Sequence, residues 1–136
     1  MDTIENVEEL RESYGAPSER SLKKQLSRLD KHCRDFIARS PFLVIASADP
    51  SGRCDASPKG DAPGFVQVID DTTLLIPDRL GNNRVDTLAN LLARPGIGLI
   101  FFVPGIRSMA GRASPPIPPC SNRLRSTAKF RAVPFW

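Results

Sequence analysis

The spacing of apolar residues predicts helices in the first forty positions. Glu5–Tyr14 has the pattern of a short amphipathic helix, which ends at Gly15 and is followed by Pro17. Ser18 begins a second predicted helix, whose apolar residues recur at steps of three and four positions. These apolar residues are Leu22, Leu26, Leu29, Cys33, Phe36 and Ile37. We therefore expect one continuous helix whose apolar stripe covers the structure that follows it.

Beyond residue 40 the pattern changes to short strands. Phe42–Ala48 is a continuous apolar run that suits a buried strand, and the turn signal at 49–52 connects it to a returning strand at Arg53–Pro58. Phe65–Ile69 and Thr72–Pro77 form a second predicted hairpin. A pair of antiparallel hairpins is therefore expected in this part of the chain.

The helical period returns once after the second hairpin. Apolar residues share one helical face between Val85 and Leu92, and Arg94-Pro95-Gly96 ends this helix. Ile97–Val103 is the most apolar strand and is expected at the centre of a barrel. Five short strands with one intervening helix predict a mainly β fold with flanking helices (α+β), built as a small mixed barrel rather than a parallel α/β sheet.

The last thirty residues do not continue this pattern. Five of the 13 prolines lie here, four of them between residues 115 and 119, where they cannot pair as an interior strand. We expect Cys120–Trp136 to lack regular structure. The predicted organisation is a helical segment at 1–40, a barrel domain at 41–113 and a proline-rich basic tail at 114–136.

The formal charge of +4 is concentrated in that tail. Residues 1–106 contain 13 Lys and Arg against 15 Asp and Glu, whereas residues 107–136 contain six Lys and Arg and no acid. Such a tail could contact nucleic-acid phosphates, but it has no interleaved aromatic pattern and no recognisable motif. Nucleic-acid binding is therefore disfavoured.

Several other classes of protein are disfavoured by the composition. No apolar run approaches the roughly 20 residues of a membrane-spanning helix, and the acidic N-terminus does not resemble a signal peptide, so a cytoplasmic location is expected. The three cysteines are far apart and form no CxxC pair, which disfavours a disulfide framework and a metal site. His32 falls in a polar helical stretch, where a solvated side chain is expected.

The sharpest candidate site is the loop before the helix that begins near Val85. Asn83 suits the N-cap position, and Asp86, three residues later, could close an exchange like a capping box. The free amides of a helix N-terminus attract anions, and Arg84 would add a guanidinium suited to phosphate oxygens. A plain helix cap with a surface arginine explains the same residues, so both interpretations stay open.

Two further candidate segments lie where predicted strands end. In 55–61, Lys59 could reach an anionic ligand and Pro58 would leave strand groups unpaired, although a plain polar loop also fits. In Pro77-Asp78-Arg79 the two charged residues could simply pair with each other. Neither a Ser-His-acid set nor paired carboxylates is visible, so we assign no catalytic residue. A bound cofactor that performs the chemistry is the remaining enzyme hypothesis.

These segments together resemble a known family. The motifs SPKGD (57–61), PDRxGNNR (77–84) and RPGIG (94–98) occur in this order, and Tyr-Gly-x-Pro occupies 14–17. In this order they resemble the pyridoxamine 5′-phosphate oxidase-related, FMN-binding split-barrel proteins, in particular a branch of FMN-dependent enzymes. The resemblance covers about three-quarters of the chain, including all of residues 40–105.

The resemblance implies a split barrel that forms a homodimer, with FMN bound in clefts at the subunit interface. It places Ser57 and Lys59 at the strand that lines the flavin. It places Pro77, Asp78 and Arg79 beside the ring or ribityl chain, and it assigns the phosphate to Asn82, Asn83 and Arg84. The implied activity is electron exchange between the flavin and a small-molecule substrate. A non-catalytic protein that binds or stores flavin or heme is the alternative.

The resemblance ends near the C-terminus, where Gly111-Arg112-Ala113 still matches and the following residues do not. Codons can be chosen for Cys120–Trp136 whose one-base shift reads as a segment similar to the family's closing strands. We therefore hypothesise a frameshift after about Ser114, which would leave the barrel incomplete and its activity impaired.

Overall fold

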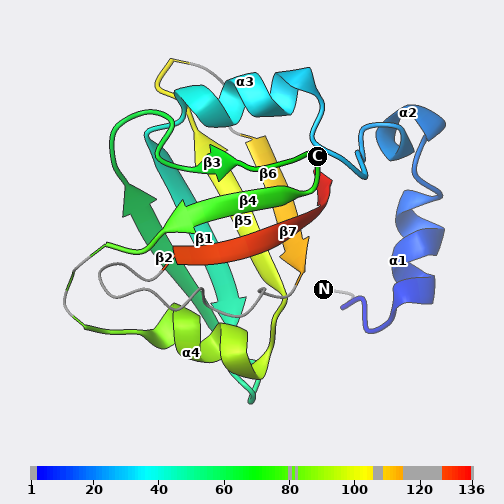
Figure 1. Cartoon of the computed structure of the whole chain (residues 1–136). Coiled ribbons are helices and arrows are strands. Elements are labelled where there is room, and N and C mark those ends of the chain that lie inside the picture. Colours follow the sequence, from blue (N-terminus) through cyan, green and yellow to red (C-terminus); the bar gives the residue numbers. More distant parts are fainter. Residues whose placement is uncertain (1–2, 80, 82, 106–108, 115–126, 136) are drawn as a thin grey trace.

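A computed structural model of the chain describes residues 3–79, 81, 83–105, 109–114 and 127–135. Seven antiparallel strands form one sheet with the order β2-β1-β5-β6-β7-β4-β3. The strands are β1 (Phe42–Ala48), β2 (Cys54–Gly60), β3 (Gln67–Val68), β4 (Thr73–Pro77), β5 (Ile97–Phe102), β6 (Met109–Ser114) and β7 (Thr127–Phe135). The sheet curves strongly, and helices α3 (Lys31–Arg39) and α4 (Asp86–Ala93) lie at its opposite ends (Figure 1).

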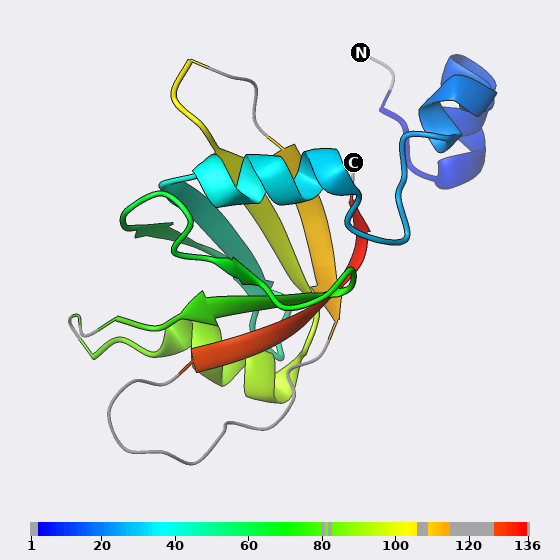
Figure 2. The same ribbon diagram turned by 45° about the horizontal axis from the view of Figure 1, so that its top comes forward.

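The sheet is curved like a barrel but it does not close. Strands β2 and β3 stand at the two ends of the strand order, and no pairing between them occurs among the described residues. Figure 2 shows the resulting half-open shape, with α3 lying across one side of it. The predicted mainly β fold with flanking helices is confirmed, and the barrel is a split one.

The core follows the alternation of side chains along the strands. In β5, Ile97, Leu99 and Phe101 are buried, whereas the residues between them are half-buried or exposed. Leu43 and Leu74 from two other strands are fully buried beside them. Because successive strand residues point to opposite faces, this alternation fixes which face of the sheet is covered.

The apolar stripe of the N-terminal region covers one end of this core. Leu29, Cys33 and Ile37 are buried, whereas Leu22 is exposed. Burial raises the pKa of the Cys33 thiol to about 11, so this cysteine is a packing residue rather than a reactive thiol. His32 is exposed, as its polar surroundings predict.

The prediction of one continuous helix from Ser18 is wrong. Ser18 does cap a helix, but α2 (Glu19–Leu22) ends after four residues. The Asp30 side chain accepts a hydrogen bond of 2.8 Å from the Cys33 amide and caps α3, while the Leu29 amide donates to the Asp71 carbonyl at 2.7 Å. These two hydrogen bonds draw the chain out of the helical path and dock it against the β3–β4 turn.

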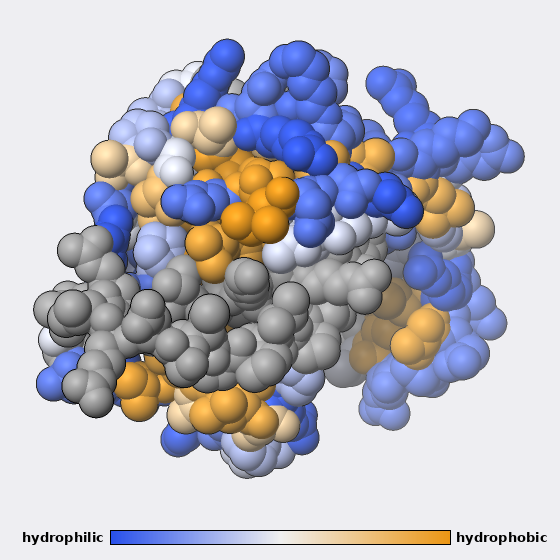
Figure 3. All heavy atoms as spheres, viewed as in Figure 1, coloured by the Kyte–Doolittle hydropathy of each residue, from blue (hydrophilic) through white to orange (hydrophobic). Residues whose placement is uncertain are grey.

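The first helix and α2 lie beside the barrel rather than over it. Helix α1 (Val7–Tyr14) is capped by Asn6 and ends at Gly15, as predicted, and it has no buried residue. In Figures 1 and 2 this N-terminal arm stands apart from the sheet. Figure 3 shows that apolar side chains gather below α3 on the barrel and again over α4, while the surface of α3 is mostly polar.

The prediction that residues 120–136 lack regular structure is wrong for β7. This strand pairs with β4 on one side and with β6 on the other, so it joins the two halves of the sheet. Its Pro134 falls at a register shift, where Gly111 faces Phe135 and Arg112 faces Val133. A proline is tolerated at such a bulge because no ladder hydrogen bond is needed from it.

Candidate functional site

A pocket of about 580 Å³ opens between β2, the end of β4 and the start of α4. Its volume falls within the range of roughly 300–1,000 Å³ that is typical of small-molecule and cofactor sites. Its lining consists of Ile45, Asp55, Ala56, Ser57, Pro58, Lys59, Ile76, Pro77, Asp78, Arg79, Gly81, Asn83, Arg84, Val85, Asp86, Thr87, Leu88 and Leu91.

Strand β2 supplies one polar wall of the pocket. Asp55, Ser57 and Lys59 are half-buried and alternate with exposed residues, so they share the inner face of the strand. Ser57 lies opposite Ile45 in the β1–β2 register, and Lys59 lies opposite the fully buried Leu43. The strand therefore places a hydroxyl and an ammonium group directly beside the apolar core.

Helix α4 is fixed against the β1–β2 hairpin, which brings its first turn to the pocket. The Asn90 side chain donates a hydrogen bond of 2.9 Å to the buried Ser47 hydroxyl, and Arg94 donates one of 2.7 Å to the Pro50 carbonyl. Near the start of the helix, Thr87 makes a longer contact of 3.5 Å with Asp55. These contacts hold the helix N-terminus beside the inner face of β2.

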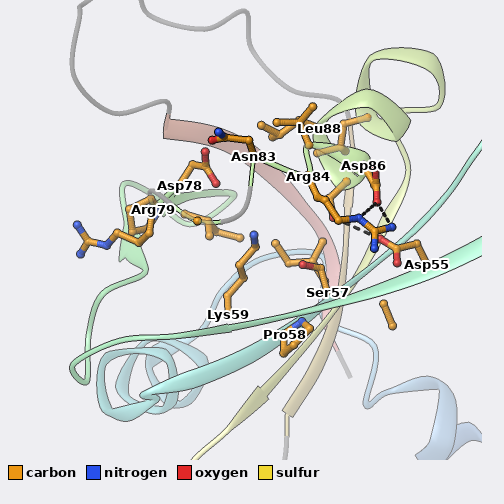
Figure 4. A pocket seen from close by; sticks show the side chains of 18 residues that line it. Asp55, Ser57, Pro58, Lys59, Asp78, Arg79, Asn83, Arg84, Asp86 and Leu88 are labelled. Atoms are coloured by element: carbon orange, nitrogen blue, oxygen red, sulfur yellow. Dashed lines mark hydrogen bonds and ion pairs between the residues drawn. The ribbon is translucent and has the colours of Figure 1, made fainter.

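Arg79 is held by an ion pair at the rim of the pocket. Its Nε donates to the Asp61 carboxylate at 2.7 Å. The Ala62 amide and Arg79 together hold the pKa of Asp61 below its usual range. Figure 4 shows the Arg79 guanidinium directed away from the middle of the pocket. The partner of Arg79 is thus Asp61, whereas the sequence suggested Asp78.

Arg84 is paired with the first residue of α4. Its Nε and Nη2 donate to Oδ2 of Asp86 at 3.0 and 2.7 Å. The predicted capping arrangement is wrong, because the N-cap of α4 is Val85 and no side chain caps this helix. Asn83 instead adopts a φ of 59°, a left-handed conformation that asparagine tolerates better than most residues.

Lys59 differs from both arginines in its surroundings. Within the described part of the chain it makes no ion pair and no side-chain hydrogen bond, although it is half-buried. Figure 4 shows its side chain directed into the pocket, on the side of Ser57. An ammonium group in this position favours an anionic or strongly polar ligand.

The pocket brings together seven of the eight residues that the sequence singled out. They are Ser57, Lys59, Pro77, Asp78, Arg79, Asn83 and Arg84. Asn82 lies outside the described residues. The sequence interpretation missed the apolar wall formed by Ile45, Ile76, Leu88 and Leu91. The apolar runs of the strands at 42–48 and 73–77 and the helical period of 85–92 carried the signal for that wall.

The composition of the lining limits the chemistry that it can perform. One side is apolar and can pack against a flat ring, while the hydroxyl, amide and cationic groups can orient a polar or anionic group. Among the described lining residues there is no histidine, cysteine, methionine or tyrosine, the side chains that commonly ligate heme iron. Ser57 has no histidine beside it within that lining, so the described geometry offers no nucleophile–base pair.

Comparisons with known proteins agree with this architecture. Residues 29–130 match the family model described as pyridoxamine 5′-phosphate oxidase, a match that covers more than half of the chain and extends into β7. No curated protein matches the chain. Among the described helices, none combines the length and the apolar character that crossing a bilayer requires.

Several solved structures share the fold at 14% sequence identity. A variant of HupZ from Group A Streptococcus has a TM-score of 0.59, with coverage of 79% of this chain and 98% of that chain. An F420 reductase has a TM-score of 0.55, with coverage of 76% and 94%. HutZ, described as the heme storage protein from Vibrio cholerae, has a TM-score of 0.53, with coverage of 79% and 90%.

Proposed function

The chain belongs to the pyridoxamine 5′-phosphate oxidase family, and from this premise we propose that its pocket binds FMN and that the protein is an FMN-dependent oxidoreductase acting on a small molecule. The observation that carries the proposal is the convergence of three sequence segments, 57–59, 77–79 and 83–84, on one cavity beside the core. Residues that are far apart in the sequence thus supply an apolar wall together with cationic and amide groups.

The proposed orientation of the cofactor follows the distribution of charge. The isoalloxazine ring would lie along Ser57, Lys59 and Pro77, beside the apolar wall. The phosphate would be bound by Asn82, Asn83 and Arg84, because guanidinium donors match phosphate oxygens. Asp78 and Arg79 would border the ribityl chain, with Arg79 closing the rim through its pair with Asp61.

The lining favours flavin over heme as the bound group. The described pocket residues include no side chain that commonly ligates heme iron, whereas flavin binding needs only apolar packing and hydrogen bonds. Titration of the purified full-length protein with FMN and, separately, with hemin tests this preference. FMN should bind, and its fluorescence should fall as the protein surrounds it. The absorbance spectrum of hemin should show no axial ligation of the iron by the protein. A ligated hemin spectrum without FMN binding would instead support the heme-storage alternative.

A turnover measurement distinguishes the two hypotheses, an FMN-dependent enzyme and a non-catalytic flavin-binding protein. When bound, FMN would supply hydride and electron transfer, and the residues of the pocket would orient it and exclude water. Reduction of the bound flavin by a nicotinamide cofactor, followed by reoxidation over many cycles, is expected of the oxidoreductase. Flavin that binds but is not reduced under these conditions would indicate a storage role.

A homodimer with FMN at the subunit interface is part of the proposal. The outer face of β1 and β5 exposes Phe42, Ile100 and Phe102, and the two phenylalanine rings lie 5.8 Å apart. Exposed apolar residues that gather on one face are typical of a surface covered by a partner. Sedimentation of the full-length protein, with and without FMN, measures whether two chains associate.

A further inference from the structure

Arg84 and Asp86 form a short-range pair whose geometry is specific. Both Nε and Nη2 of the guanidinium donate to the same carboxylate oxygen, at 3.0 and 2.7 Å. A guanidinium is planar and carries five donors, so a contact made through the Nε side fixes both its plane and the direction of its terminal edge. The contact with the carboxylate therefore constrains the direction in which the Arg84 guanidinium faces.

Much of the Arg84 side chain is accessible to solvent. Its side chain retains 76% of its accessible surface, so packing does not select a single rotamer. Long exposed side chains lose rotamer freedom when they bind a ligand, and this loss weakens binding. A contact that already selects the binding rotamer in the free protein reduces this entropic cost of binding.

Asp86 belongs to a helix that is attached to the rest of the fold. It is the first residue of α4, and the hydrogen bonds from Asn90 to Ser47 and from Arg94 to Pro50 attach this helix to the hairpin. An acidic side chain in the first helical turn is also favoured by the helix dipole. The backbone of Asp86 is thus held in place by α4, and its carboxylate extends from this anchored position.

We propose that Asp86 is a positioning residue that orients the Arg84 guanidinium toward the phosphate of the cofactor. This inference rests on the proposed function, because it needs a phosphate ester in the pocket. The opposite effect is the physical alternative. In that case the Asp86 charge would compete with the phosphate for Arg84 and repel it, and removal of the carboxylate would strengthen binding.

The chain contains a matched control for this pair. Arg28 and Asp71 form an aspartate–arginine ion pair of the same chemistry at 2.6 Å, and neither residue lines the pocket. Asp71→Asn therefore removes a comparable charge away from the pocket and leaves the contact between Arg84 and Asp86 in place.

The test is a double-mutant cycle on the full-length protein, with dissociation constants measured for FMN and for riboflavin, which lacks the phosphate. Asp86→Ala should weaken FMN binding by about three- to tenfold and leave riboflavin binding unchanged. In the Arg84→Ala background, Asp86→Ala should have no further effect, because a positioning residue acts only through the side chain that it positions. Asp71→Asn should leave the ratio of FMN to riboflavin affinity unchanged.

Three outcomes overturn the inference. If Asp86→Ala binds FMN as tightly as the wild type or more tightly, Asp86 either has no role or competes with the phosphate for Arg84. If the effect of Asp86→Ala persists in the Arg84→Ala background, Asp86 acts by its own charge. Equal loss of FMN and riboflavin would show damage to the pocket as a whole. If the wild-type protein binds neither flavin, the proposed function fails as well, so the two failures are distinguishable.

Discussion

Lys59 and Arg79 line the same pocket, but their charges are balanced differently. Arg79 is neutralised by Asp61, whereas Lys59 has no ion-pair partner among the described residues. A half-buried ammonium group is partly desolvated, so an anionic or polar ligand group gains more from it than from a cation that is already paired. Lys59 is therefore expected to contribute more to ligand affinity than Arg79.

Lys59→Met tests this difference, because it keeps most of the length of the side chain and removes its charge. The loss of one charged hydrogen-bond donor should weaken FMN binding by about tenfold or more, measured by fluorescence quenching. Lys24→Met, at an exposed position outside the pocket, should leave the affinity unchanged. Equal affinities for all three proteins would exclude a role for Lys59 in binding.

The residues that the sequence singled out line one pocket, but the sequence did not predict their contacts. The motifs located Ser57, Lys59 and Arg84 at one pocket because motif residues and strand ends are local features. The partners could not be predicted in the same way. Asp61 pairs with a residue 18 positions away, and Asp86 binds Arg84 instead of capping the helix. Such choices depend on how loops approach each other in three dimensions.

Among the helices and strands, too, the features set by local sequence were predicted and those set by long-range contacts were not. Strand β1 has the predicted bounds, and the two hairpins and α4 occur where the hydrophobic pattern placed them. The long N-terminal helix is divided because the Leu29 amide binds the Asp71 carbonyl, a tertiary contact that helical periodicity does not encode.

Strand β7 was missed although part of its signal is local. Residues 128–132 alternate small or aromatic residues with Lys129 and Arg131, which is a strand pattern. The neighbouring prolines and the high positive charge argued against a strand, so this pattern was not recognised. Because β7 pairs with strands from two distant parts of the chain, its position in the sheet could not be inferred from its own residues.

Helix α3 provides a prediction at the scale of one element. Asp30→Ala removes the N-cap and should lower the free energy of unfolding by about 1 kcal/mol at neutral pH, measured by urea denaturation. The Cys33 amide holds the pKa of Asp30 below its usual value. A lowered pKa means that the contribution of the carboxylate is present above the ordinary aspartate pKa and is lost as the pH falls through the folded-state value.

The difference in stability between wild type and Asp30→Ala should therefore shrink on acidification below about pH 4. Asp30→Asn is the matched control, because asparagine is also a good N-cap but does not titrate. A gap between wild type and Asp30→Ala that stays constant down to the lowest pH at which the protein is folded would contradict this explanation.

At the scale of the whole molecule, β7 is the element that joins the sheet. It lies between β6 and β4, so all strands belong to one continuous order from β2 to β3. Helix α1, in contrast, has no buried residue. The two termini are therefore expected to differ strongly in their contribution to stability.

Two deletions compare these termini. Removal of residues 115–136 exposes unpaired edges on β4 and β6, a loss comparable to the roughly 5–15 kcal/mol of a typical domain, so cooperative thermal unfolding should disappear. Removal of residues 1–15 should lower the Tm by less than about 4 °C. Similar thermal melts for both deletions would show that β7 does not hold the sheet together.

The hypothesis of a frameshift after about Ser114 stays a prediction. The family match reaches residue 130 and a strand forms at 127–135, so residues 127–135 take part in the sheet whatever their origin. The codons of residues 115–136 test the hypothesis, because a shifted frame that does not encode the family's closing segment would reject it.

The most direct test of the central claim is a calorimetric titration of the full-length protein with FMN. Binding in the pocket between β2, β4 and α4 predicts saturable heat with one FMN per chain, and this heat should diminish in the Lys59→Met and Arg84→Ala proteins. A folded, colourless protein that releases no heat with FMN would contradict the proposal that this pocket is a flavin site.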